Sequence, residues 1–231
     1  MFNKSHLFKG FLTFGLVILI SFTTVSALYE DSEDITLMKN IETFQETILK
    51  SDFLSVMLFC SQKVENCVLL EPIYKEFAKT MKDFVKIYAV DCDKLDPTND
   101  EVGEFPLCKP ESVQYLPYLV TYEPPATKIN PYTNQPSKPT ERAYQGTGDP
   151  KSIANFARQH MPAFREIITS KEGLEAFLND QYVPNKVILF TNKPQTSPLY
   201  KSLASEYRDR LLVRYFDFYF LFSSSQKSMK V

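Results

Sequence analysis

The residues of this chain with the greatest capacity for chemistry are its four cysteines, Cys60, Cys67, Cys92 and Cys108. In thiol–disulfide exchange a thiolate attacks a disulfide sulfur, so two neighbouring cysteines can cycle between dithiol and disulfide. The four lie 7, 25 and 16 residues apart and include no C-x-x-C pair, which makes them a poor zinc site. Four cysteines allow three different two-disulfide pairings, and the spacing alone leaves all three open.

Other groups common in catalysis are scarce. Only two histidines are present: His6 lies in the N-terminal leader, residues 1–27, and His160 falls at the end of a predicted helix, where a surface role is the simpler interpretation. The sequence has no Gly-rich phosphate-binding loop. With 26 basic and 28 acidic residues, the formal net charge of −2 gives no field that would attract nucleic acid. We therefore expect no cofactor, no metal ion and no nucleic-acid partner.

One stretch of sequence positions two of the cysteines. Residues 54–59 form a short apolar run that predicts a buried strand, and Cys60 follows it directly. A helix is predicted from Val64 to about Met81, interrupted by Pro72, with Cys67 near its start. Its apolar positions at helical spacing are Val68, Leu69, Leu70, Ile73, Phe77 and Met81. A buried strand that feeds a helix starting near a cysteine is the active-site layout of a thioredoxin fold.

The register around Cys67 resembles that of the protein disulfide isomerase family. There the strand is followed by W-C-G-H-C, a basic pair and L-x-P-x-Y or F; here Cys67 is followed by V-L-L-E-P-I-Y. Cys67 therefore falls on the second cysteine of the motif, and Val64 falls on the first. Leu58 falls on the family's buried acidic residue. The resemblance thus implies a thioredoxin site that has lost its nucleophile and its proton acceptor.

Two further segments extend the resemblance. Val90-Asp-Cys92-Asp matches the family's V-D-C-T after the third strand, and the segment from Val113 to Leu119 matches Y-x-V-x-G-Y-P-T-L. In the family, the proline of that segment is cis and faces the active site, so the resemblance predicts a cis Leu116–Pro117 bond. Its backbone could pair with an extended peptide. The predicted substrate-binding residues are Leu116, Pro117, Tyr118 and Val64.

The resemblance implies a role for Cys92 and Cys108, whereas the roles of Cys60 and Cys67 stay open. Cys92 and Cys108 resemble a structural disulfide found in some family members. Cys67 is either a buried structural thiol or a thiol that traps clients as mixed disulfides. Cys60, four residues before the lost nucleophile, could pair with Cys67 as a relocated redox couple, although sequence cannot establish the separation that a disulfide needs.

The remaining pattern completes one domain over residues 28–161, of which about 35–161 carry the resemblance. We predict a short edge strand at 35–37, a helix after Asn40, and strands at 84–90 and 118–122. Residues 123–142 contain five prolines and predict an extended hairpin insertion. Residues 143–146 are predicted as the last strand, and Asp149-Pro150 as the start of the closing helix.

Residues 1–27 have the features of a secretory signal peptide. Lys4, His6 and Lys9 form a basic start, residues 11–20 an apolar core, and Val25-Ser-Ala27 a cleavage site. The alternative, a membrane anchor, is disfavoured because the apolar core is short. We expect the endoplasmic reticulum lumen or the secretory pathway, where disulfides persist, and no membrane association apart from the signal.

Residues 162–231 predict part of a second, cysteine-free thioredoxin-like domain. Strands are predicted at 167–169 and 184–190 and from 211, with helices after Ser170 and Ser197. The aromatic run 215–222 shows no strand or helix alternation, so we expect the pattern to stop there. These residues are too few for a whole domain, and we expect a shortened version of a longer protein.

The sequence therefore predicts an α/β protein with one thioredoxin fold and a partial second one. The resemblance implies a role in protein folding, and the missing nucleophile favours a redox-inactive module that binds unfolded or partly folded secretory polypeptides. The rival hypothesis is a thiol–disulfide oxidoreductase that acts through Cys67 alone or through Cys60 and Cys67.

Overall fold

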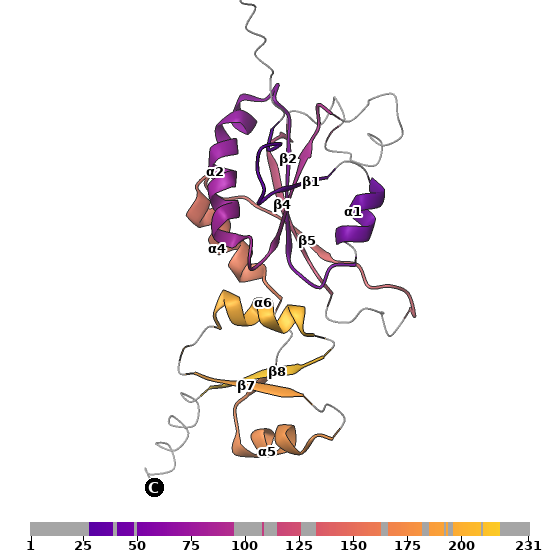
Figure 1. Cartoon of the computed structure of the whole chain (residues 1–231), viewed down its shortest axis with the longest axis vertical. Coiled ribbons are helices and arrows are strands. Elements are labelled where there is room, and N and C mark those ends of the chain that lie inside the picture. The colour runs from indigo at the N-terminus through magenta and orange to yellow at the C-terminus, as the bar shows by residue number, and fades with distance from the viewer. Residues whose placement is uncertain are drawn as a thin grey trace, which may run out of the picture.

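The computed structural model describes residues 28–38, 41–48, 50–94, 108, 115–125, 133–162, 166–181, 185–191, 193, 196–208 and 210–217. These residues form two units along the long axis of the molecule (Figure 1). The first unit carries every described cysteine, and the second follows α4 in the chain.

The first unit is built on a five-stranded mixed sheet with the strand order β1-β3-β2-β4-β5. Its strands are β1 (Thr36–Leu37), β2 (Ser55–Cys60), β3 (Lys86–Asp91), β4 (Tyr118–Glu123) and β5 (Thr140–Ala143). β3 pairs in parallel with β1 and β2, whereas β4 is antiparallel to β2 and to β5. All six residues of β2 are buried, as expected for a central strand covered on both faces.

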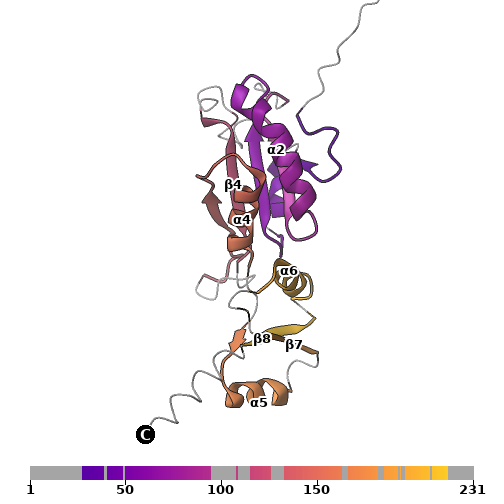
Figure 2. The same cartoon turned by 90° about the vertical axis from the view of Figure 1, so that its left-hand side faces the viewer.

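Helices cover both faces of this sheet. α1 (Ile41–Ile48) lies on one face, and α2 (Glu65–Met81) and α4 (Pro150–His160) lie together on the other (Figures 1 and 2). Asp149 caps α4, because its carboxylate accepts the Ser152 N–H at 2.9 Å and Pro150 opens the helix. The predicted α/β layering is confirmed. α2 begins a few residues after the end of β2.

The segment before β1 is part of the core. Leu28 and Tyr29 are 4% and 1% exposed, and the Tyr29 ring meets the Tyr74 ring edge-on at 5.7 Å. Acidic residues of the segment then pair with lysines of the body: Asp31 with Lys75 at 2.7 Å, Asp34 with Lys82 at 2.9 Å, and Glu30 with Lys94. From the sequence alone, residues 28–34 are no more than an acidic segment before the first strand, because two apolar residues are too few to show a period.

The last strand of the first unit lies earlier than predicted. β5 spans Thr140–Ala143 rather than residues 143–146, and it pairs Ala143 with Val120. All four β5 residues are exposed, so an edge strand with no buried face shows no apolar alternation. Gly146 then turns the chain beneath the Tyr144 ring, where a Cβ atom would overlap that ring.

The second unit repeats the first half of the first. β6 (Glu166–Ile168), α5 (Lys171–Asn179), β7 (Lys186–Thr191), α6 (Pro198–Glu206) and β8 (Leu212–Asp217) follow the order strand, helix, strand, helix, strand. The sheet order is β6-β8-β7 with both pairs parallel, which matches β1-β3-β2. Ser170 and Ser197 cap α5 and α6, as predicted, through the N–H groups of Gly173 and Tyr200.

Two expectations for this unit were wrong. The aromatic run does not end the pattern at residue 215, because β8 continues to Asp217 between two parallel neighbours, a position in which strands need no alternation. The apolar run within residues 184–190 also predicts that this strand is buried, yet Val187 and Phe190 of β7 are 38% and 53% exposed. Among the described residues, β8 is the one strand that pairs with β7. The other edge of β7 is therefore not covered by a described strand.

The units meet through α6 and the residues after it. Ser202 donates a hydrogen bond to the carbonyl of Asp83 at 3.3 Å, and Lys201 to the carbonyl of Arg158 at 3.0 Å. Arg208 forms an ion pair with Asp52 at 3.0 Å. Within the described ranges, none of the helices has the length and apolar character needed to cross a membrane.

Candidate functional site

The candidate site begins where β2 passes into α2. The chain turns through Ser61, Gln62 and Lys63, and Val64 is the N-cap of α2 with φ −104° and ψ 113°. Val64 has no side-chain group that could accept a helix N–H, and its side chain packs against the core. The position at which the resemblance places a nucleophile is therefore a half-buried hydrocarbon at a helix start.

Cys60 and Cys67 are free thiols, and both are fully buried. The N–H of Ser61, the residue after Cys60, donates a hydrogen bond to the Cys67 sulfur at 3.3 Å. The neighbouring Cys60 thiol and this N–H lower the pKa of Cys67, although burial opposes them. The pKa of Cys60 is raised, first by the neighbouring Cys67 sulfur and then by burial. Cys67 is thus the thiol of this pair that ionises more readily.

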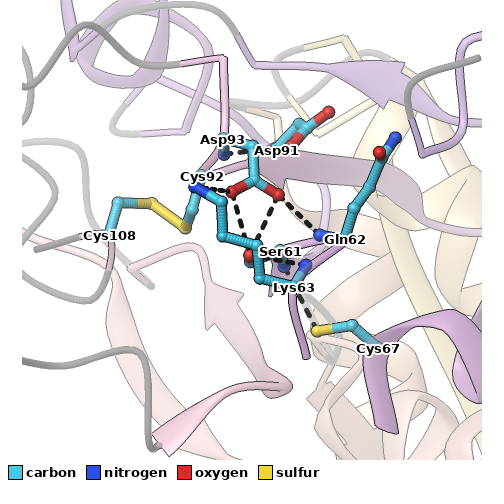
Figure 3. The surroundings of a disulfide bond; sticks show 8 residues. All are labelled: Ser61, Gln62, Lys63, Cys67, Asp91, Cys92, Asp93 and Cys108. Atoms are coloured by element: carbon cyan, nitrogen blue, oxygen red, sulfur yellow. Dashed lines mark hydrogen bonds and ion pairs between the residues drawn. A yellow bond between two sulfur atoms is a disulfide. The ribbon is translucent and has the colours of Figure 1, made fainter. Parts of the chain in front are cut away.

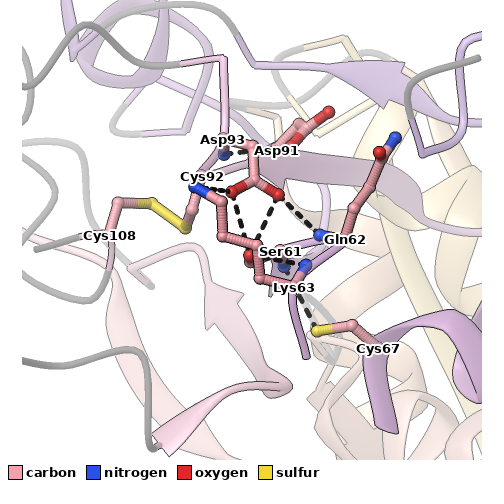
Figure 4. Close-up of polar contacts among 8 residues, drawn as sticks. All are labelled: Ser61, Gln62, Lys63, Cys67, Asp91, Cys92, Asp93 and Cys108. Atoms are coloured by element: carbon pink, nitrogen blue, oxygen red, sulfur yellow. Dashed lines mark hydrogen bonds and ion pairs between the residues drawn. A yellow bond between two sulfur atoms is a disulfide. The ribbon is translucent and has the colours of Figure 1, made fainter. Parts of the chain in front are cut away.

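Asp93 fixes the turn between β2 and α2. Its carboxylate accepts hydrogen bonds from the Ser61 hydroxyl at 2.9 Å and the Gln62 N–H at 2.6 Å, and it pairs with Lys63 at 3.0 Å (Figure 4). Burial acts to raise the pKa of Asp93, but the bonds from Lys63, Ser61 and Gln62 outweigh it and lower the pKa below its usual value. Asp93, which lies just after β3, therefore holds the turn between β2 and α2 in place.

Beside this network, Cys92 and Cys108 form a disulfide with 4.9 Å between their Cα atoms (Figure 3). This is the pairing that the resemblance implied. The bond ties Cys108 to the chain directly after β3, next to Asp93, and it leaves Cys60 and Cys67 as the remaining two thiols of the chain.

A groove lies on the other side of the α2 start. The Leu116–Pro117 peptide bond is cis, as predicted, and Pro117 lines a cavity of about 340 Å³. The groove also touches α2, β4, the turn after β5 and α4. The residues that line it are Asn66, Leu69, Leu70, Ile73, Pro117, Leu119, Tyr144, Gly146, Gly148 and Ile153. Most of the lining side chains are apolar, and polar atoms contribute much of the open surface, a combination found in binding sites.

Only one of the four predicted substrate-binding residues lines this groove. Leu116 is 5% exposed and belongs to the core. Tyr118 packs against Phe59 at 6.3 Å between ring centroids, and its hydroxyl donates to Glu141. Val64 is half-buried but is not among the lining residues. Pro117 is the member of the predicted set that borders the open space.

Residues 35–124 match the thioredoxin family model. These residues form a thioredoxin domain. Over this domain and beyond it the chain is similar to proteins named protein disulfide-isomerase. A Dictyostelium discoideum protein that carries that enzyme's name is 26% identical over 189 residues, 82% of this chain and 42% of its own. Human protein disulfide-isomerase A6 is 33% identical over 92 residues, 40% of this chain and 21% of its own.

Two other relatives match both the thioredoxin domain and part of the second unit. A thioredoxin domain-containing protein of Schizosaccharomyces pombe, named as mitochondrial, is 27% identical over 172 residues, 74% of this chain and 43% of its own. The crystal structure of ERdj5 form II superposes with a TM-score of 0.54 at 19% identity, over 82% of this chain and 23% of that one. The chain spans less than half the length of each of these proteins.

Sequence reasoning missed most of the groove in the thioredoxin domain because it assigned the apolar residues of α2 to the core. The buried stripe of α2 consists of Cys67, Tyr74, Phe77, Ala78 and Met81. Val68 and Leu69 are instead 46% and 61% exposed. Three consecutive apolar residues after Cys67 are more than one helix face can bury, and that excess is the signal that could have identified this surface.

Proposed function

We propose that the thioredoxin domain serves protein folding as a peptide-binding module that performs no thiol–disulfide exchange on its clients. The clients are unfolded or partly folded secretory polypeptides. The observation that carries the proposal is the pairing of an apolar groove beside cis Pro117 with a helix start that carries Val64 instead of a thiol. An apolar side chain of an extended peptide would enter the groove, and the backbone beside Pro117 would hydrogen-bond to the peptide.

The burial of the thiols supports the non-catalytic part of the proposal. Exchange with a client disulfide requires the attacking sulfur to reach a sulfur of the client. Cys60 and Cys67 are both 0% exposed, so a folded or extended polypeptide cannot approach either one without opening the start of α2. The oxidoreductase hypothesis remains as the alternative, and the observation in its favour is that Cys60 at the end of β2 and Cys67 in the first turn of α2 are both free thiols.

The binding test uses a permanently unfolded probe, a reduced and carboxymethylated polypeptide with a fluorescent label. Leu69→Asp places a charge in the groove and should weaken binding at least about tenfold, since the bound peptide would cover this charge without pairing it. Val68→Asp is the matched control, because Val68 is the neighbouring exposed apolar residue and does not line the groove. Equal binding by wild type and both variants would contradict the groove as the binding site.

The redox test measures reduction of a model protein disulfide by the wild type and by Val64→Cys. A thiol at position 64 would sit at a helix N-terminus, which lowers its pKa, three residues before Cys67. We expect background activity for the wild type and activity above it for Val64→Cys. Turnover by the wild type that is lost in Cys67→Ser would instead establish the oxidoreductase alternative.

We further propose that the module works in the secretory pathway, in the endoplasmic reticulum lumen. Support comes from the signal-like pattern of residues 1–27, which lie outside the described residues, and from the Cys92–Cys108 disulfide, which persists in oxidising compartments. Imaging of a fusion at the C-terminus against endoplasmic reticulum and mitochondrial markers tests this, because a relative is named as mitochondrial. Loss of the reticular pattern on deletion of residues 1–27 is expected.

A further inference from the structure

Peptide binding at the groove does not use the two buried thiols Cys60 and Cys67, which are the most unusual chemical feature of the domain. Cys60 ends β2 and Cys67 lies in the first turn of α2, and the N–H of Ser61, the residue after Cys60, donates to the Cys67 sulfur at 3.3 Å. Two neighbouring free thiols are the reduced form of a disulfide. Their burial excludes a protein disulfide as the reactant but does not exclude an oxidant of the size of water.

The surroundings of the pair are polar and incompletely satisfied. Asp91 stands opposite Cys60 in the register of β3 and β2 and is 5% exposed. Its Oδ1 accepts the Asp93 N–H at 3.1 Å, whereas its Oδ2 is buried without a hydrogen-bond partner in the described part of the chain. The Tyr29 hydroxyl lies against Cys60 and also has no well-aligned partner there. These two oxygens can accept from or donate to an oxidised sulfur.

The first turn of α2 lacks a side-chain cap, although Asp93 holds the turn that precedes it. An N-cap side chain that accepts a helix N–H stabilises the first turn, and Val64 provides none. Glu65 and Asn66, which flank Cys67 on its N-terminal side, are exposed. Fraying of this one turn would bring solvent to Cys67 while the β2 end of the pair stays in place.

We infer that Cys60 and Cys67 form a peroxide-sensitive dithiol that closes to an intramolecular disulfide. In the first step Cys67 attacks hydrogen peroxide: an S–O bond forms, the O–O bond breaks, and one water leaves with the thiol proton. Cys67 is then a sulfenic acid. In the second step Cys60 attacks the Cys67 sulfur: the S–S bond forms, the S–O bond breaks, and a second water leaves with the Cys60 proton. Two thiols are oxidised and one peroxide is reduced to two waters.

The test treats the chain from Leu28 onward with hydrogen peroxide and then alkylates it in denaturant. Trypsin cleaves after Lys63, so a Cys60–Cys67 disulfide joins the peptides 51–63 and 64–75, which separate on reduction. We expect the two alkylatable thiols of the untreated protein to disappear together as this linked pair appears. Treated Cys60→Ser protein should instead carry a sulfenic acid at Cys67 that dimedone traps.

Several outcomes would overturn the inference. The linked peptides could be absent while both thiols stay alkylatable, or each cysteine could be oxidised separately to sulfinic acid. Linkage of either peptide to one that contains Cys92 or Cys108 would show exchange with the existing disulfide instead. The wild-type experiment decides without any variant, so a misfolded Cys60→Ser protein leaves the result intact, and it is independent of peptide binding at the groove.

Discussion

Asp93 decides the geometry of the candidate site although it lies in neither β2 nor α2. One carboxylate receives two hydrogen bonds and an ion pair from three successive residues, Ser61, Gln62 and Lys63. A single side chain thus defines the path of the chain into α2. Because its own side chain is 22% exposed, solvent screens these bonds only in part.

We predict that Asp93→Asn lowers the free energy of unfolding at pH 7 by about 1–3 kcal/mol, the usual worth of hydrogen bonds to a charged group. The folded-state pKa of Asp93 lies below its usual value, so this stabilisation is complete above about pH 4 and is lost as the pH falls through the folded-state pKa. Urea unfolding of wild type and variant should therefore differ at neutral pH and converge as the pH falls below the folded-state pKa of Asp93.

Glu76→Gln is the control for Asp93→Asn, because Glu76 is an exposed acidic residue in α2 away from the turn. It should leave the unfolding curve within about 0.5 kcal/mol of wild type at both pH values. A stability difference for Asp93→Asn that persists unchanged at low pH would show that packing, rather than the ionised carboxylate, holds the turn.

Individual residues were predictable from sequence where a motif constrained them. The register of Cys67 and Pro117 gave the loss of the nucleophile, the cis peptide bond and the Cys92–Cys108 pairing. The groove was not predictable in this way. Its lining comes from four separate segments, and whether Leu69 points to the core or to solvent depends on how α2 rotates against the sheet.

At the scale of elements, the segment before β1, residues 28–34, packs across the C-terminal half of α2, and we call it the strap. Tyr29 inserts its ring beside Tyr74, and Asp31 and Asp34 pair with lysines of α2 and its C-cap. Tyr29 adopts a positive φ of 68°, which is unusual for a residue with a large side chain. The backbone conformation and the buried ring together fix where the strap enters the core.

We predict opposite results for two substitutions of Tyr29. Tyr29→Ala removes a fully buried ring and should cost about 3–5 kcal/mol of unfolding free energy. Tyr29→Phe removes only a buried hydroxyl without a well-aligned partner among the described residues, so stability should stay level or rise by up to about 2 kcal/mol. Chemical denaturation of both variants tests this, and a large loss in Tyr29→Phe would mean that the hydroxyl makes a stabilising bond to Cys60.

Elements with a strong period were recoverable from sequence, and edge elements were not. α2 and β2 were predicted within about one residue because one is long and the other is almost entirely apolar. β5 was placed three residues late because all its side chains are exposed. The strap was taken for a simple lead-in because its stabilisation comes from contacts with residues more than 40 positions away.

At the scale of the molecule, the chain contains one complete thioredoxin domain followed by a unit that repeats its first half. The shared strand order, β1-β3-β2 and β6-β8-β7, explains why one sequence pattern predicted both. The same comparison explains the exposure of Val187 and Phe190. In the first unit β2 has β4 as its second neighbour, and β7 has no such neighbour among the described strands.

The contact between the units rests on polar groups of the second unit. Among these groups Arg208 forms an ion pair, in which its side chain is 12% exposed and that of its partner Asp52 is 28% exposed. Partial burial makes such a pair stronger than a surface ion pair, and it also makes the loss of one partner costly. Lys201 and Ser202 donate only to backbone carbonyls, whose positions the first unit fixes independently.

We therefore predict that Arg208 and Asp52 couple the stability of the two units. In a double-mutant cycle, Arg208→Ala and Asp52→Ala should each destabilise the chain, and the double variant should cost less than their sum by at least about 1 kcal/mol. Arg208→Lys keeps the charge but loses the planar guanidinium, so it should recover only part of the coupling. Costs that simply add within about 0.5 kcal/mol would mean that the units are joined by the backbone and by α6 rather than by this ion pair.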